Sequence, residues 1–312
     1  MRAVEVTEFG GPEVLRLGTA SDPVAGTGQV VVDVTVAEVL MMDTMIRRGL
    51  GRPYFPIEPP YAPGSGVAGV VTSVGVDVTT DWVGQRVVVE LGGGGYAEKA
   101  VASADELIPV PDGLELPDAM ALLHDGATAW GLLELTPVSA GQTVLVQPAA
   151  GGLGTVLVQL LAARDVRVVA VARGARKLAL AKELGADTVV DYGEPGWEKR
   201  VGAVDVAFDG VGGELGRAAF SRVRDGGQFF NYGNASGSPT DVPRDGGVTV
   251  RGLETLSGMH DDYRRRAVEV FAEAAAGRIR AVIGETYPLE QVAEAHSALE
   301  SRASFGKLLL VP

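Results

Sequence analysis

The sequence predicts an α/β protein in which a small β-rich unit accompanies a doubly wound parallel sheet. Short valine-rich runs, bounded by Gly, Pro and Asp, recur through the first hundred residues and are typical of a barrel or sandwich. After residue 143, short apolar strands alternate with helical stretches, which favours a parallel sheet covered by helices on both faces. The run 306–312 predicts a closing strand that rejoins the N-terminal β unit, because chain termini often lie close together.

Taken in order, the first strands are expected at 29–36, 66–75 and 85–91. No long helical period precedes about residue 117. The second part starts with the strand 143–147 (TVLVQ), and a glycine-rich turn leads from it into the helical run 155–164. Further strands of this sheet are expected at 166–172, 188–192, 204–212, 227–233 and 247–253, with a helix at 175–185. Two helices, 263–277 and 289–301, precede the closing strand.

Composition excludes several classes of partner. The 312 residues carry 27 Lys and Arg against 40 Asp and Glu, a net charge of −13, which disfavours phosphate backbones and anionic lipid. The uncharged stretch 135–163 is long enough to span a bilayer, but its Pro and Gly residues indicate a strand, a turn and a helix instead. We therefore expect no nucleic-acid partner and no membrane association.

The chain has no cysteine and only three histidines, His124, His260 and His296. Disulfides, thiolate nucleophiles and sulfur-ligated zinc are thereby excluded. No two histidines stand at ligand spacing, so we expect no metal site. The absence of cysteine fits a cytoplasmic protein. Glycine is the compositional outlier, with 43 residues in clusters, so functional sites are sought there.

The turn after the strand 143–147 reads PAAGGLG and ends at Gly154. A glycine-rich turn from strand to helix lets the backbone approach a pyrophosphate, and the helix N-terminus offers free N–H groups and a partial positive charge. The spacing from Gly151 to Gly154 lacks the first glycine of the strict fingerprint, but the strand, helix and second strand lie in the required order. The sequence thus predicts a dinucleotide site, with a purely structural turn as the alternative.

The residues after the second strand of this sheet select among dinucleotides. An acidic residue at the end of that strand usually binds the ribose of NAD. Here the strand ends at Ala172, and Arg173, Arg176 and Lys177 follow. These cations would neutralise a 2′-phosphate, so we predict NADP(H) rather than NAD(H). The alternative is that they are solvated charges at the start of a helix.

Segments along nearly the whole chain carry a family resemblance. They are 9–15 (FGGPEVL), 46–49, 60–75 (PYAPGSGVAGVVTSVG), 84–88, 94–101, 126–130, 140–154, 183–192, 233–237 and 300–312. With them the chain resembles the zinc-free quinone oxidoreductase (zeta-crystallin-like) branch of the medium-chain dehydrogenase/reductase superfamily. The resemblance implies a GroES-like β-rich catalytic domain built from 1–116 and 283–312, a Rossmann NADP(H)-binding domain over 117–282, and an active site in the cleft between them.

The resemblance also implies roles for individual residues. The pyrophosphate would lie at Gly151, Gly152, Leu153 and Gly154. The 2′-phosphate would be held by Lys177, Tyr192 and Arg302, assisted by Arg173. Thr128 and Asn234 match positions that contact the nicotinamide half of the cofactor.

Several departures from the family pattern concern the substrate. Leu40 replaces a usual Asn, Met45 a frequent Tyr, and Gly66 a frequent acidic residue, while His124 and Asp125 stand where apolar, Gln or Lys residues are commoner. We predict an apolar pocket that includes Leu40, Met41, Met42, Asp43 and Met45. Methionine is adaptable and suits a flat or bulky hydrophobic substrate, although these methionines could equally be core residues.

The expected reaction is hydride transfer from NADPH to a quinone or an α,β-unsaturated carbonyl, without a metal. His124 and Tyr54 are the candidate catalytic proton donors, and a neutral, hydrogen-bonded role is the alternative for His124. His296 is predicted to be structural. A specialised tailoring enone reductase with a bulky hydrophobic substrate, and an NADPH-binding protein without turnover, are the competing functions. We expect a homodimer that pairs edge strands near 248–253.

Overall fold

The computed structural model describes residues 1–50 and 56–312, with side chains except at 257 and 259–261. Tyr54, one of the two predicted proton donors, lies outside the described residues. The chain divides into two compact units. Unit 1 comprises Met1–His124, Phe271–Ala276 and Ala281–Pro312, and unit 2 comprises Asp125–Val270 and Gly277–Arg280.

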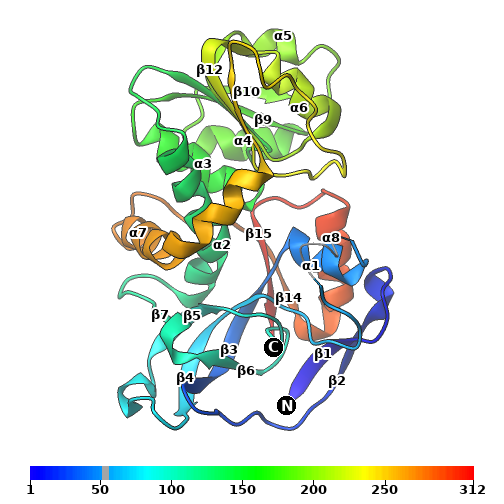
Figure 1. The fold of residues 1–312 in the computed structure, drawn as a ribbon, viewed down its shortest axis with the longest axis vertical. Coiled ribbons are helices and arrows are strands. Elements are labelled where there is room, and N and C mark those ends of the chain that lie inside the picture. Colours follow the sequence, from blue (N-terminus) through cyan, green and yellow to red (C-terminus); the bar gives the residue numbers. More distant parts are fainter. Residues whose placement is uncertain (51–55) are drawn as a thin grey trace. The chain divides into compact units, whose positions relative to one another are not determined.

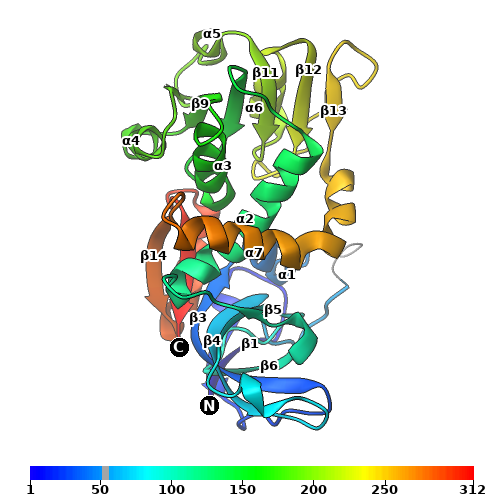
Figure 2. The same ribbon diagram turned by 90° about the vertical axis from the view of Figure 1, so that its left-hand side faces the viewer.

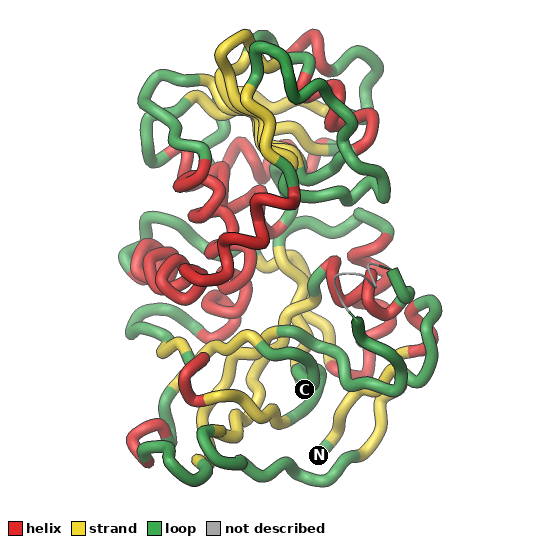
Figure 3. The backbone as a smooth tube through the Cα atoms, in the orientation of Figure 1, coloured by secondary structure: helices red, strands yellow, loops and turns green. Residues whose placement is uncertain are grey.

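A seven-stranded sheet forms most of unit 1 (Figure 3). Its path runs β14 (Ile283–Pro288), β15 (Lys307–Val311), β3 (Gln29–Val39), β4 (Gly66–Val74), β5 (Arg86–Glu90) and β7 (Ile108–Pro109), and β6 (Lys99–Ser103) pairs with β3. A separate antiparallel pair joins β1 (Arg2–Val6) and β2 (Leu15–Thr19). The short helices of this unit are η1 (Pro12–Val14), α1 (Met41–Arg47), η2 (Thr80–Trp82), η3 (Ala104–Glu106), η5 (Leu289–Gln291) and α8 (Val292–Glu300).

Strand β3 is the centre of unit 1 because it pairs with β4, β6 and β15. Valines at alternate positions bury one face of the strand, and Val30 and Val32 are fully buried in its core cluster. The predicted closing strand is confirmed, since β15 lies antiparallel to β3 with Leu308 opposite Val39. Both chain ends consequently belong to unit 1 (Figure 1).

Unit 2 is built on a six-stranded parallel sheet, as the alternating pattern predicts. Its order is β10 (Thr188–Asp191), β9 (Arg167–Ala172), β8 (Thr143–Gln147), β11 (Val204–Asp209), β12 (Val223–Asn231) and β13 (Thr249–Arg251). Figure 2 shows β11, β12 and β13 side by side, with β13 at the edge where the sequence places the dimer strand.

The helices that follow these strands are α3 (Gly152–Ala162), α4 (Ala175–Glu183), α5 (Glu198–Val201), α6 (Gly213–Phe220) and η4 (Leu253–Asp262). Two longer helices, α2 (Leu116–Leu135) and α7 (Tyr263–Ala275), each contribute residues to both units. Central strands are apolar on both faces, so Leu145, Val171 and Phe229 are all buried. Helix α3 begins three residues before the predicted run, because Gly152 and Gly154 belong to its first turn. Within the described part of the chain, no helix is long and apolar enough to cross a membrane.

The strand order fixes where a ligand can bind in unit 2. From β8 the chain moves to β9 on one side, whereas β11 lies on the other side of β8. Such a reversal leaves a crevice beyond the carboxyl ends of the two adjacent strands, and ligands of open α/β sheets bind there. Gln147 and Asp209, the last residues of β8 and β11, therefore border the expected site.

Candidate active site

The turn between β8 and α3 lies at the carboxyl end of β8, which borders the crevice. Gly151 is the N-cap of α3, with φ −79°, and as a glycine it makes no capping hydrogen bond through a side chain. A Cβ on Gly154 would overlap the carbonyl oxygen of Pro148 and lie 3.0 Å from Ala149 Cα. Glycine is thus required at 154 by close packing of the helix against the turn, while Gly151 has space around it. The geometry matches a helix N-terminus that can receive an anion.

An acidic residue of the neighbouring strand lies beside the end of β9. Asp191, the last residue of β10, accepts N–H hydrogen bonds from Gly174 (2.9 Å) and Gly193 (2.7 Å). Its carboxylate is thus held by backbone amides beside Arg173, which is exposed. Parallel neighbouring strands end at the same edge of a sheet, and this pairing brings Asp191 opposite Ala172. The acid that lies beside the end of β9 therefore comes from the neighbouring strand.

The other residues predicted for the 2′-phosphate fall in both units. Lys177 lies half-buried in α4, and burial lowers its pKa. The backbone N–H of Tyr192 donates to Ala172 (3.1 Å), so this tyrosine lies beside the end of β9. Arg302 belongs to unit 1, in the exposed turn after α8, with a φ of 57°. The structure therefore brings Arg173, Lys177 and Tyr192 to one end of the sheet in unit 2.

Asp209 organises the carboxyl ends of three adjacent strands. Its buried carboxylate accepts hydrogen bonds from Gln147 Nε2 (2.9 Å), Asn231 Nδ2 (3.0 Å), Thr240 Oγ1 (2.8 Å) and the backbone N–H of Val211 (2.9 Å). A buried carboxylate with this many donors is electrostatically satisfied. We infer that Asp209 fixes the shape of the crevice and is not a reacting group.

Two acceptor atoms in this region have no partner among the described residues. They are the buried Gln147 Oε1 and Asn234 Oδ1. A Cβ on Gly212 would lie 2.9 Å from Asn234 Oδ1, so Asn234 packs against the loop that follows β11. Buried acceptors usually find a donor, and these two are available to one supplied by a ligand. Thr128, the other residue predicted near the nicotinamide, lies half-buried in α2 within the same unit.

In unit 1, His124 takes part in a buried cluster of charges. Its Nδ1 is hydrogen-bonded to Glu38, which is completely buried in β3. The second oxygen of Glu38 forms an ion pair of 2.6 Å with Lys307, which is also buried. The other ring nitrogen of His124 lies 3.4 Å from Glu90 Oε1. Two carboxylates thus surround one imidazole and one ammonium.

The cluster holds His124 in its charged form. Burial alone would lower the pKa of His124, but the Glu38 and Glu90 carboxylates outweigh it and raise the pKa to about 10. Burial would likewise raise the pKa of Glu38, but His124 and Lys307 lower it to about 2. Gly66 leaves room for this arrangement, because a Cβ there would overlap Glu38 Oε1 and lie 3.0 Å from Met120 Cε. His124 is therefore a fixed cation at neutral pH.

A second buried network surrounds Asp43 in α1. The carboxylate accepts hydrogen bonds from the Leu40 N–H (2.9 Å), Ser65 Oγ (2.9 Å) and Tyr96 OH (3.1 Å). Tyr96 OH also lies 3.1 Å from Nε2 of His296, a completely buried residue whose pKa burial lowers to about 3. Burial raises the pKa of Asp43 itself. His296 is thus a neutral structural group, as predicted.

The predicted substrate residues share one short segment but differ in exposure. Leu40 is the N-cap of α1, Met41 and Asp43 lie in its first turn, and Met45 is 37% exposed. A small cavity of about 20 Å³ adjoins Asp43 and has room for one water molecule. Its lining includes Tyr61, whose pKa burial raises to about 12 and whose buried hydroxyl has no partner among the described residues. Asp43 is thus engaged in holding α1, while the methionines are accessible.

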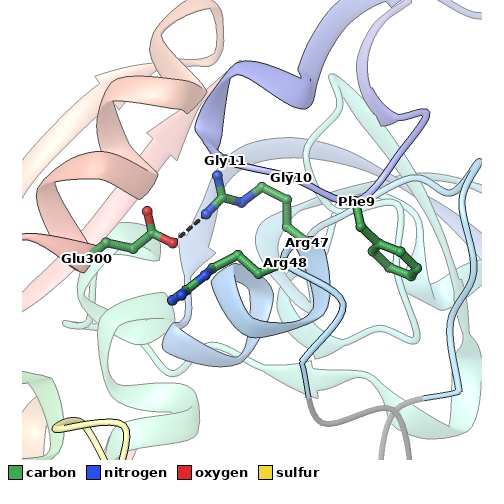
Figure 4. A pocket seen from close by; sticks show the side chains of 6 residues that line it. All are labelled: Phe9, Gly10, Gly11, Arg47, Arg48 and Glu300. Atoms are coloured by element: carbon green, nitrogen blue, oxygen red, sulfur yellow. Dashed lines mark hydrogen bonds and ion pairs between the residues drawn. The ribbon is translucent and has the colours of Figure 1, made fainter.

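A larger pocket of about 470 Å³ lies at the other end of α1 (Figure 4). Arg47 and Arg48 extend toward Glu300 there, whereas Phe9 points away from them. Arg47 is buried, and its ion pair with Glu300 leaves Nε and Nη1 without a partner among the described residues. Burial lowers the pKa of Arg47. The pocket is therefore lined by a buried arginine and its ion-pair partner, beside the N-terminal loop.

Sequence reasoning missed Glu38, Lys307 and Asp209, which organise the polar interior of the two units. Each is a charged residue within or next to an apolar strand, in VAEVL, GKLLL and VAFDG. A charge in such a run is rarely fully buried unless it is paired. That signal identifies the residues as buried, but their partners come from distant parts of the chain.

Comparison with known proteins identifies the family. Residues 26–112 match the model of the alcohol dehydrogenase GroES-like domain, and residues 184–310 match that of a zinc-binding dehydrogenase. A probable quinone oxidoreductase of Schizosaccharomyces pombe is 33% identical over 323 residues, covering 99% of this chain and 96% of the relative. The chain belongs to the quinone oxidoreductase branch of the medium-chain dehydrogenase/reductase superfamily.

Solved structures of this family have the same fold. A mycobacterial protein in complex with NADPH matches with a TM-score of 0.90 and 34% identity, over the full length of both chains. Quinone oxidoreductase of Escherichia coli, also in complex with NADPH, matches with a TM-score of 0.90 and 27% identity over both full lengths. Although one matching family model is described as zinc-binding, the described residues of this chain contain no group of three or more His, Asp or Glu arranged to hold a metal ion.

Proposed function

We propose that this quinone oxidoreductase family member is an NADPH-dependent enzyme that transfers a hydride to a quinone or an α,β-unsaturated carbonyl without a metal. The observation that carries the proposal is the full-length similarity to quinone oxidoreductases, together with the similarity to two solved structures in complex with NADPH. The absence of cysteine supports a reaction without zinc. We assign the catalytic domain to 1–116 and 283–312 and the cofactor domain to 117–282.

The residues of unit 2 fit a dinucleotide in three places. The N-terminus of α3 offers backbone N–H groups and a partial positive charge for a pyrophosphate at Gly151, Gly152, Leu153 and Gly154. Arg173, Lys177 and Tyr192 gather at the end of β9, where a 2′-phosphate needs cations and donors. The unpartnered oxygens of Gln147 and Asn234 suit a carboxamide N–H. When bound, NADPH supplies the hydride.

The groups of unit 1 bind the acceptor in this proposal. The exposed methionine of α1 and its neighbours offer an adaptable apolar surface for a flat substrate. His124, with its pKa near 10, holds its proton too firmly to be an efficient acid at neutral pH. We therefore assign it a positioning role within the buried charge cluster, and Tyr54 stays the predicted proton donor.

The test compares NADPH and NADH oxidation with a panel of quinones and enones. We expect turnover with NADPH and little with NADH. In R173A and K177A, NADPH affinity should fall about tenfold or more, while NADH affinity is unchanged. K199A is the matched control, because it removes an exposed lysine from α5. A preference for NADH would overturn the 2′-phosphate assignment, and NADPH binding without turnover on any acceptor would overturn the enzymatic proposal.

The assembly and location are parts of the same proposal. The terminal position of β13 in the sheet supports a homodimer, because an unpaired edge strand is a template for another strand. Sedimentation of wild-type protein and of V250P, which removes a backbone donor from β13, tests it. A monomeric wild-type protein would contradict the assignment. The cytoplasmic location expected from the sequence stays a prediction.

A further inference from the structure

Asp125 holds a negative charge against the helix N-terminus that the proposed function assigns to pyrophosphate. Asp125 lies in α2 and, like Gly152, belongs to unit 2. A Cβ on Gly152 would overlap Asp125 Oδ2 and lie 2.8 Å from its Cγ. The carboxylate therefore rests directly on the first residue of α3.

A second observation places the same carboxylate at the crevice. Asp125 and Asp209 both add to the effect of burial in raising the pKa of Tyr232. Tyr232 follows β12 directly, and its hydroxyl donates to the carbonyl oxygen of Gln147 at the end of β8 (3.2 Å). Asp125 is thus close both to the start of α3 and to the carboxyl ends of β8 and β12.

The place of the Asp125 carboxylate explains why residue 152 is a glycine, without reference to a ligand. In a dinucleotide fingerprint, a glycine at this place lets the backbone approach the pyrophosphate. Here the space above Gly152 is taken by the Asp125 carboxylate, so any larger side chain would collide with it. The carboxylate interacts favourably with the helix dipole, and a pyrophosphate would have to share the same partial positive charge.

We propose that Asp125 is an affinity-determining residue that weakens dinucleotide binding by opposing the pyrophosphate at the N-terminus of α3. The proposal rests on the proposed function. Two anions at one helix end repel each other, and the repulsion is strong where water is partly excluded. Cofactor affinity is therefore set by a balance between cations at the end of β9 and one carboxylate at the start of α3. A weaker complex releases spent cofactor more readily, which favours turnover when release is slow.

The test is a titration of full-length wild-type protein and D125N with NADPH, followed by cofactor fluorescence. Asn keeps the shape of Asp, so the contact with Gly152 is retained while the charge is removed. We expect the Kd for NADPH to fall about tenfold, which corresponds to about 1.4 kcal/mol. The difference between the two proteins should shrink at high salt, because screening weakens the repulsion. D125S serves as a second uncharged variant if D125N is poorly folded.

Two controls separate this effect from a general change in charge. D225N makes the same change in net charge at an exposed position near the amino end of β12, whereas the crevice lies beyond the carboxyl ends of the strands. It should leave the Kd for NADPH unchanged. Adenosine 2′-monophosphate lacks the pyrophosphate, so its affinity should be equal in wild type and D125N.

Each outcome is decisive. Equal or weaker NADPH binding by both D125N and D125S, or an equal gain for adenosine 2′-monophosphate, overturns the role of Asp125 and leaves the proposed function intact. If neither wild type nor the variants bind NADPH, the proposed function fails and this inference fails with it.

Discussion

Replacing Glu38 by glutamine should destabilise the protein severely, although the two side chains have nearly the same shape. Glu38 is completely buried and is the shared partner of His124 and Lys307. Glutamine would remove the negative charge that both cations share in the interior, while Glu90 would stay near His124. Burial of a charge without its partner is among the few single changes that cost more than 3 kcal/mol.

The size of the effect follows from the pKa of His124. Its rise from 6.5 to about 10 corresponds to about 5 kcal/mol of interaction favouring the imidazolium form. Glu38 supplies most of that interaction, but in E38Q the imidazole can release its proton and limit the loss. We therefore expect E38Q to lose about 3–5 kcal/mol of unfolding free energy at pH 7.

The assay is urea unfolding at pH 7, with E5Q as control because Glu5 is exposed in β1 of the same unit. E5Q should change the unfolding free energy by less than about 0.5 kcal/mol. Proton NMR adds a direct readout, since a chain with three histidines gives few imidazole resonances. The resonances of His124 should show that its imidazole stays protonated up to about pH 10. In E38Q it should titrate well below that. An E38Q protein as stable as E5Q, or a wild-type His124 that titrates near 6.5, would refute the reasoning.

Three further predictions concern pH and the glycine turn. The pKa of His124 in the folded protein lies above its unfolded value, so the stability that its charge contributes is complete below pH 6.5 and disappears as the pH rises through about 10. In urea unfolding, H124Q should therefore lose this decline of stability at alkaline pH. The pKa of His296 in the folded protein is lowered to about 3, so stability should fall as the pH drops from 6.5 toward 3. H296Q should flatten that decline. An equally steep decline in H296Q and in the wild-type protein would contradict the neutral state of His296. G154A should destabilise the protein by about 1–3 kcal/mol in thermal unfolding because its Cβ overlaps the turn, whereas G151A, with its nearest neighbour 3.7 Å away, should be tolerated; similar effects of the two would contradict the packing.

Strand periodicity predicted most of the sheet in unit 2 but little of the polar interior. The run TVLVQ forms β8 over the expected residues 143–147, because a buried parallel strand is apolar on both faces and ends abruptly. The edge strand β13 is shorter than the predicted 247–253, since it pairs with β12 over only three residues. Edge strands have fewer partners to fix their ends, so pattern alone defines them poorly.

The environment of His124 could not be predicted because it is made by long-range contacts. Glu38, Glu90 and Lys307 come from three different strands, and their approach depends on the pairing of β15 with β3 and of β4 with β5. The sequence shows a lone histidine, which is compatible with a neutral hydrogen-bonded group or a proton donor. Only the register of the strands reveals a fixed cation between carboxylates.

The two glycines that bear most on function owe their identity to carboxylates from other elements. Gly66 faces Glu38, and Gly152 faces Asp125, and in both cases an added Cβ would overlap a carboxylate oxygen. Neither residue has a positive φ, so backbone conformation does not require glycine at these positions. In this chain a glycine can therefore indicate a packed acid as readily as a bound phosphate. The glycine-rich turn alone is weak support for a dinucleotide, and the stronger support comes from the cations at the end of β9 and the strand order that forms the crevice.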